Sequence, residues 1–194
     1  MDAFNFAFSL FAIVLGLALV EVLTGFARAL KRRHVVHLGW VTPVAAIYVM
    51  LDLTSFWEFG WGSRRFVSPQ YGYLLIGLLV SGLYYLAASL IFPSELGEGD
   101  RKLQAKDFDA HYMQHRRQVF GAVFLCDFIE MAPVFIIRFH EIPARVWAEN
   151  VVQFSALATC ILSRSKRANI TALSILIGIY VYTAVMSFVT PVPL

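Results

Sequence analysis

Charged residues are scarce in this sequence. Asp, Glu, Lys and Arg make up only 15% of its 194 residues, whereas 59% are hydrophobic, and the mean hydropathy is +0.67. A water-soluble domain of this length needs far more charge to cover its surface. The scarcity argues against a soluble protein and predicts a chain whose solvent is largely lipid.

Cysteine is almost absent, and the motifs of common hydrolases and nucleotide-binding enzymes are missing. The two cysteines, Cys126 and Cys160, lie inside apolar segments at different expected depths, which argues against a disulfide and favours small buried side chains. There is no Walker loop, no Gly-x-Ser-x-Gly turn and no metalloprotease motif. We therefore expect a protein that is not an enzyme.

Basic residues are present but are not spread as in a nucleic-acid-binding protein. The sequence pI is about 9.0, yet Lys and Arg gather in short clusters between apolar runs, which is typical of membrane topology signals. We expect the lipid bilayer as the main partner, and no nucleic acid.

Six apolar segments are long enough to cross a bilayer, which takes roughly 20 helical residues. They cover residues 4–28, 38–59, 70–92, 118–138, 145–163 and 169–190. Pro43 and Pro133 lie inside expected helices, where proline kinks the chain. The sequence predicts an all-α fold, a polytopic transmembrane helical bundle of six spans that forms a single integral membrane domain over 1–194.

The positions of Lys and Arg predict the direction of these spans. Twelve of the sixteen lie at 28–33, 101–117 and 164–167, in connections that share one side. Because positively charged loops stay in the cytoplasm, we predict that both termini face outside. The first apolar run lacks a basic leader and a cleavage site, so we expect it to remain as a span.

One long connection joins the third and fourth spans. It begins with the glycine-rich, acidic "SELGEGD" and continues as "DFDAHYMQHRRQVF", which has a helical pattern. We predict that the second part forms one short cytoplasmic helix, with Phe108, Tyr112 and Met113 toward lipid or the bundle.

Carboxylates inside the spans are the candidate functional groups. Asp127 and Glu130 lie near mid-membrane, three residues apart and thus on one helix face, and Asp52 lies in the outer half of the second span. A charge near the bilayer centre costs at least ~2.5 kcal/mol, so such groups normally face the bundle interior or water. Two close carboxylates do not both ionise easily in a low dielectric. These residues predict a proton- or cation-handling site.

A structural role is the alternative for the same acids. They would then bond to backbone groups freed by the kinks, pair with Arg138, or accept hydrogen bonds from Tyr48, Tyr180 and Tyr182, as buried polar ties between membrane helices do. No span carries the broken-helix glycine pattern of ion sites, which favours this structural interpretation.

Glu21 lies in the first span, one or two turns before its inner end. It can pair with Arg28, two turns further on the same face, or with a neighbouring span. Gly16 and Gly25 flank it and would allow another helix to approach closely. We predict that Glu21 and Arg28 form a polar tie that fixes helix packing.

Histidines give only a weak metal signal. Asp107, His111 and His115 share a helical stripe, and an i, i+4 pair of histidines is a known ligand spacing. The first and third members are about 12 Å apart along the axis, so they cannot readily share one ion. All five histidines lie at or outside the expected interfaces, which argues against a haem site. We expect no cofactor and no bound metal.

Four segments carry a resemblance to a known group. "GLALVEVLTGFARALKRR", "LDLTSFWEFGW", "YLAASLIFPSE" and "FDAHYMQHRRQVFGAVFLCDF" cover roughly the first two-thirds of the chain. Through these four segments the chain resembles a family of small, six-span bacterial inner-membrane proteins that has no established activity. "HYMQHRR" stands where that family has a pair of aromatics. The resemblance implies a multi-pass protein of the bacterial inner membrane and transfers no functional residue.

Two functions are open. The first is a non-catalytic helical scaffold or subunit that packs with a second copy of itself or with another membrane protein through its polar ties. The second is a transporter of protons, cations or a small solute past Asp127 and Glu130. An enzyme that acts on lipid with His111, His115 and the arginines is a third and weaker hypothesis.

Overall fold

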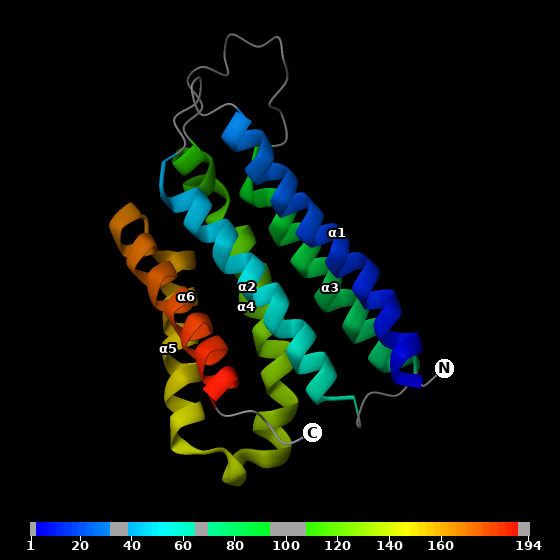
Figure 1. Ribbon diagram of the computed structural model, residues 1–194. Helices are drawn as coiled ribbons and strands as arrows, with labels where there is room; N and C mark the ends of the chain where they lie inside the picture. Colours follow the sequence, from blue (N-terminus) through cyan, green and yellow to red (C-terminus); the bar gives the residue numbers. More distant parts are fainter. Residues whose placement is uncertain (1–2, 32–38, 65–69, 94–107, 190–194) are drawn as a thin grey trace.

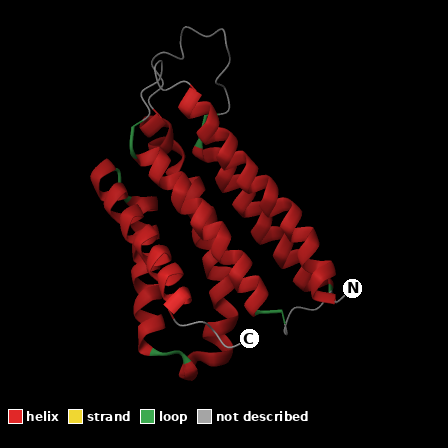
Figure 2. Cartoon of the chain, in the orientation of Figure 1, coloured by secondary structure: helices red, strands yellow, loops and turns green. Residues whose placement is uncertain are grey.

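The structure is a computed structural model that describes residues 3–31, 39–64, 70–93 and 108–189, without the side chains of residues 137, 138 and 141. Within these ranges the chain is entirely helical apart from turns and loops (Figure 2). The helices are α1 (Ala3–Lys31), α2 (Val41–Gly62), α3 (Tyr71–Ile91), α4 (Phe108–Arg138), α5 (Ala144–Leu162) and α6 (Lys166–Val189), with a 3-10 turn η2 (Phe139–Glu141) after α4. The all-α fold class is confirmed.

Four of the six helices, α1, α3, α4 and α6, are long and apolar enough to cross a membrane. The other two, α2 and α5, have 22 and 19 residues, but their apolar stretches are less hydrophobic. The polar residues of α2 include Asp52 and Glu58, and those of α5 include Arg145 and Glu149. A chain with four such helices is compatible with an integral membrane protein.

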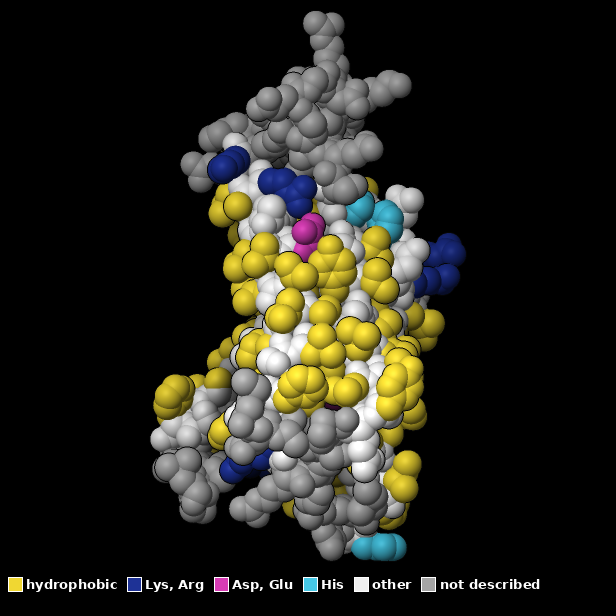
Figure 3. All heavy atoms as spheres, turned by 90° about the vertical axis from the view of Figure 1, so that its right-hand side faces the viewer, with side chains coloured by type: hydrophobic (Ala, Val, Ile, Leu, Met, Phe, Trp, Pro, Cys, Tyr) yellow, Lys and Arg dark blue, Asp and Glu magenta, His cyan; other side chains and the backbone are white. Residues whose placement is uncertain are grey.

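Successive helices run in opposite directions, so the two ends of the chain lie at the same end of the bundle (Figure 1). We call this the terminal end and the opposite one the basic end, because Arg28, Arg116 and Lys166 belong to helix segments there. Hydrophobic side chains cover the middle of the face formed by α1 and α3, and Lys and Arg gather mainly toward one end of that face (Figure 3).

Helix α2 is the centre of the bundle. It packs against α1, α3, α4 and α6, while α1–α3, α3–α4, α4–α5 and α5–α6 are the other neighbouring pairs. Its fully buried residues include Ala45, Tyr48, Val49 and Asp52. Its buried residues form one broad side, while Ile47 and Trp57 on the remaining side are apolar and exposed by 43% and 39%, so that α2 has no single apolar stripe.

Close packing between α1 and α3 depends on a glycine. A Cβ atom at Gly77 of α3 would lie 2.3 Å from Cζ of Phe11, which is buried on α1. The missing side chain lets the phenylalanine ring lie directly against the α3 backbone. Small residues at such contacts are the usual means by which membrane helices approach one another.

The two prolines behave differently from one another. Pro43 occupies the first turn of α2, which begins at Val41, so its missing N–H is one that the helix leaves unpaired anyway. The predicted kink at Pro43 is therefore wrong. Pro133 lies inside α4, as predicted, and the helix continues past it to Arg138.

The helix predicted between the third and fourth spans is the first part of α4, not a separate element. Phe108 and Tyr112 are buried in the bundle, with exposed fractions of 1% and 2%. The Tyr112 hydroxyl donates to Asn169 Oδ1 of α6 at 2.8 Å. This segment therefore packs inside the bundle, because its aromatic side chains find partners on neighbouring helices.

Candidate functional site

Three carboxyl groups lie together near the middle of the bundle. Asp52 belongs to α2, whereas Asp127 and Glu130 share a face of α4, and their exposed fractions are 0%, 6% and 9%. Each lies within electrostatic range of the other two. The structure thus brings Asp52 to the Asp127–Glu130 pair, and we call the three residues the carboxyl cluster.

Asp52 joins two helices through tyrosine hydroxyls. Its Oδ1 atom accepts hydrogen bonds from Tyr48, one turn earlier on α2, at 3.2 Å and from Tyr180 on α6. Tyr182, the third tyrosine considered from the sequence, instead packs against Arg145, whose Cζ lies 5.1 Å from the ring centroid. Two of the three expected tyrosines therefore contact the cluster.

Asp127 joins α4 to α5. Gln153 Nε2 donates a hydrogen bond to Asp127 Oδ2 at 2.8 Å, and this amide was not singled out from the sequence. The alternative pairing with Arg138 lies outside the described residues, because the side chain of Arg138 is not described.

Three buried oxygens near this point have no hydrogen-bond partner in the described part of the chain. They are Asp52 Oδ2 on α2, the Tyr84 hydroxyl on α3 and Glu130 Oε1 on α4. Tyr84 lies close to both carboxyl groups and is 1% exposed. Buried polar atoms are nearly always paired, and the Tyr84 hydroxyl interacts with both carboxyl groups, so one proton placed among the three groups would complete their hydrogen bonds.

The chemistry of the cluster follows from this arrangement. Three carboxylates held together away from water repel one another and are costly to bury unless something offsets their charge. A bound proton would offset it, since a protonated carboxyl group carries no charge and can donate a hydrogen bond to its neighbour. The unpartnered tyrosine hydroxyl can donate to a carboxylate or accept from a proton carrier, because it is both donor and acceptor.

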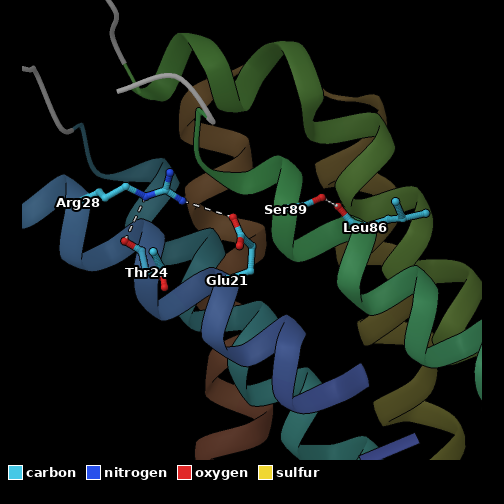
Figure 4. A network of polar contacts seen from close by, with 5 residues as sticks. All are labelled: Glu21, Thr24, Arg28, Leu86 and Ser89. Atoms are coloured by element: carbon cyan, nitrogen blue, oxygen red, sulfur yellow. Dashed lines mark hydrogen bonds and ion pairs between the residues drawn. The ribbon is translucent and has the colours of Figure 1, made fainter. Parts of the chain in front are cut away.

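Glu21 pairs with Arg28 of its own helix, which is one of the two pairings expected from the sequence. Its Oε1 atom lies 3.4 Å from Nη2 of Arg28, and the two side chains are 35% and 33% exposed. Arg28 Nε also donates to Thr24 O, while the nearby Ser89 hydroxyl on α3 donates to Leu86 O of its own helix (Figure 4). The pair therefore lies at the side of the bundle, remote in sequence and in partners from the carboxyl cluster.

The glycines that flank Glu21 differ in their surroundings. A Cβ atom at Gly25 would lie 2.1 Å from Cδ2 of Phe92, whereas one at Gly16 would have no neighbour within 4 Å. Close packing beside Glu21 thus occurs at Gly25, against the end of α3.

His111 and His115 lie together, with ring centroids 4.2 Å apart. His111 Nε2 lies 3.1 Å from Leu90 O, and His115 Nδ1 lies 3.0 Å from His111 O. Among the described residues no group of three or more His, Cys, Asp or Glu could hold a metal ion. Asp107, the third member of the predicted stripe, lies outside the described residues.

A further polar site, not predicted from the sequence, lies at the basic end. Asp109 Oδ1 accepts hydrogen bonds from the backbone N–H groups of Val41 at 3.1 Å and Thr42 at 3.3 Å, and its Oδ2 lies 3.7 Å from Lys166 Nζ. Asp109 on α4 therefore caps the first turn of α2. Gly39, with φ +56°, leaves room for this carboxylate, since a Cβ atom there would lie 2.2 Å from Asp109 Cγ.

No family model, no curated protein and no solved structure matches the chain.

Proposed function

We propose that the chain is a six-span bacterial inner-membrane protein with both termini outside. At 1.5 Å per residue, α2 and α5 extend about 33 Å and about 28 Å, close to the ~30 Å thickness of a hydrocarbon core. Asp52 of α2 is enclosed by the other helices, which spares it contact with lipid. The concentration of Lys and Arg in three connections supports the orientation.

We further propose that the carboxyl cluster binds a proton and that the protein moves protons across the membrane without catalysis. The observation that supports this proposal is the meeting of three buried oxygens without a close hydrogen bond, from α2, α3 and α4, at Asp52, Tyr84 and Glu130. Ionisable groups inside a membrane normally belong to ion pathways or proton relays. A proton shared between the two carboxyl groups and the tyrosine hydroxyl would satisfy these atoms.

The test is ion flux into liposomes that contain the purified protein. Proton, sodium and potassium gradients are imposed separately, so that the transported species is identified by the gradient that drives flux. We expect the native protein to conduct protons and the variants Asp52→Asn and Glu130→Gln to lose most of that flux. Glu21→Gln is the matched control, because it removes a carboxylate of a span outside the cluster and should leave flux unchanged.

A static role is the second candidate, and one observation favours it. Hydrogen bonds from Tyr180 to Asp52 and from Gln153 to Asp127 tie α6 to α2 and α5 to α4. A scaffold that packs with a second copy or another membrane protein would need such ties only for rigidity. If native protein shows no flux under any gradient while Tyr180→Phe lowers the thermal stability in detergent, by about 0.6 kcal/mol as is usual for such bonds, the scaffold proposal replaces the transport proposal.

A further inference from the structure

Packing is much tighter at the basic end of the helices α4, α5 and α6 than at the terminal end. The buried residues of α5 all lie in its second half, and those of α6 lie in its first half. Because the two helices are antiparallel, both sets lie toward the basic end (Figure 1). They are Ala156, Leu157 and Cys160 on α5, and Asn169, Ala172, Leu173 and Leu176 on α6.

Burial on these helices stops at the level of the carboxyl cluster. Residues 144–155 of α5 and 177–189 of α6 include no buried residue, and Glu130 is the last buried residue among the described side chains of α4. From the cluster to the terminal end, α5 and α6 therefore contribute no fully buried side chain, and the contact between α4 and α5 is made there by half-buried rings such as Phe135 and Trp147, whose centroids are 4.8 Å apart. Toward the basic end, in contrast, Tyr112, Phe120, Leu157 and Leu173 are at most 2% exposed.

A polar stripe runs along the loosely packed half of α5. Arg145, Glu149 and Gln153 follow one another at intervals of four residues, so they lie on one side of the helix. Arg145 Nε and Glu149 Oε1 are 2.7 Å apart, with side chains 59% and 38% exposed. Gln153 is half-buried and bonds to Asp127 of the cluster at 2.8 Å. Exposure thus falls steadily from the end of the helix to the cluster.

The stripe leads from an exposed end to an inner end between helices. Gln153 reaches α4 through Asp127, and the exposed Arg145 guanidinium lies over the ring of Tyr182 on α6. Val151, on the opposite side of α5, is apolar and 60% exposed. Charged and amide groups that lead from the end of a helix to a buried site are suited to carry water into a membrane protein, because lipid offers these groups no hydrogen bonds.

We propose that the carboxyl cluster is reached from the terminal end, along the stripe Arg145–Glu149–Gln153, and is closed toward the basic end. This inference rests on the proposed function, since it assigns the entry route for the proton. Glu149 is the first anionic group on the route, and its pairing with Arg145 keeps the mouth close to neutral. Gln153 is a positioning residue: its N–H holds Asp127, which leaves its carbonyl oxygen free to accept a hydrogen bond from water.

The experiment measures the reaction of single introduced cysteines with a charged, membrane-impermeant methanethiosulfonate reagent in oriented proteoliposomes. Gln153→Cys is compared with two matched controls on the same helix. Val151→Cys lies on the opposite side of α5 at an exposed apolar position, and Ala156→Cys is buried one turn closer to the basic end. The native cysteines, Cys126 and Cys160, are buried, so unmodified protein supplies the baseline.

We expect Gln153→Cys to react at least about tenfold faster than either control, because thiols react as hydrated thiolates, and only with reagent added on the side of the termini. Equal rates for Gln153→Cys and Val151→Cys, or reaction from the opposite side, would overturn the proposed route. If Gln153→Cys does not fold, Asn150→Cys replaces it: this position lies one turn nearer the mouth and should also react from the terminal side alone.

The two proposals fail in different ways. Labelling does not depend on transport. If Gln153→Cys reacts but the native protein shows no flux, the transport function is overturned and the water-accessible route remains. Flux that depends on Asp52 and Glu130 together with an unreactive Gln153→Cys overturns the route and leaves the function.

Discussion

Single polar residues in this bundle connect segments that are far apart in the sequence. Asp109 is the clearest case, because it lies 68 positions after Val41, whose N–H it binds. We predict that Asp109→Ala lowers the free energy of unfolding by about 1–2 kcal/mol, since helix α2 loses its capping acceptor and two N–H groups lose their partner. Thermal unfolding in detergent measures the change.

Asp109→Asn is the matched control for the capping prediction. It retains an oxygen acceptor for Val41 and Thr42 and loses only the charge that faces Lys166, which is half-exposed. We expect it to cost much less than the alanine variant. Equal losses in the two variants would show that the ion pair, and not the cap, stabilises the helix.

Residues of the carboxyl cluster could be predicted from the sequence only where the spacing along one helix places them together. Asp127 and Glu130 were recognisable because acids three residues apart in an apolar run share a helix face. The roles of Tyr84 and Gln153 were not recognisable, since each acts through a residue on a different helix. The partner of a buried side chain is fixed by tertiary packing, which a single sequence does not encode in any local pattern.

The close contact between helices α1 and α3 at Gly77 gives a second prediction. Gly77→Ala should destabilise the protein although alanine is favoured over glycine within helices by about 1 kcal/mol, because the new Cβ atom would lie 2.3 Å from the Phe11 ring. Gly82→Ala on the same helix has no neighbour within 4 Å and should stabilise it. Melting temperatures of the two variants should therefore shift in opposite directions.

The contact with Phe11 is tested by a second substitution. Phe11→Leu shortens the side chain that fills the glycine position, so Gly77→Ala should cost less in a Phe11→Leu background than in the native one. Additive effects of the two substitutions would contradict a direct contact, since only neighbouring residues couple strongly.

The boundaries of the elements were predictable where apolar length alone sets them. The third and fifth segments, 70–92 and 145–163, correspond closely to α3, Tyr71–Ile91, and α5, Ala144–Leu162. The fourth was expected to begin at 118, whereas α4 begins at Phe108. Arg116 and Arg117 interrupt the apolar run there but not the helix, because the Arg116 guanidinium bonds to Ser163 O at 2.9 Å within the bundle.

The number of membrane crossings is the open question at the scale of the whole molecule, and it decides which end of the bundle is cytoplasmic. If only the four most apolar helices cross and the N-terminus is outside, α2 and α5 remain on one side, and the connection that contains Arg101, Lys102 and Lys106 faces outside. That arrangement opposes the rule that basic loops stay in the cytoplasm. Six crossings place the same connection inside.

A reporter enzyme that is active only outside the cytoplasm separates the two arrangements. Fused at the C-terminus it should be active in both, because either four or six crossings return the chain to the side where it began. Fused after Asp100 it should be inactive with six crossings and active with four. We expect an active C-terminal fusion and an inactive fusion after Asp100, and the C-terminal result shows that the reporter is exported. Activity of the fusion after Asp100 would contradict six spans. The two ends of α2 and of α5 could then not lie on opposite sides of the membrane, so the proposed opening of the carboxyl cluster to the outside would also be wrong.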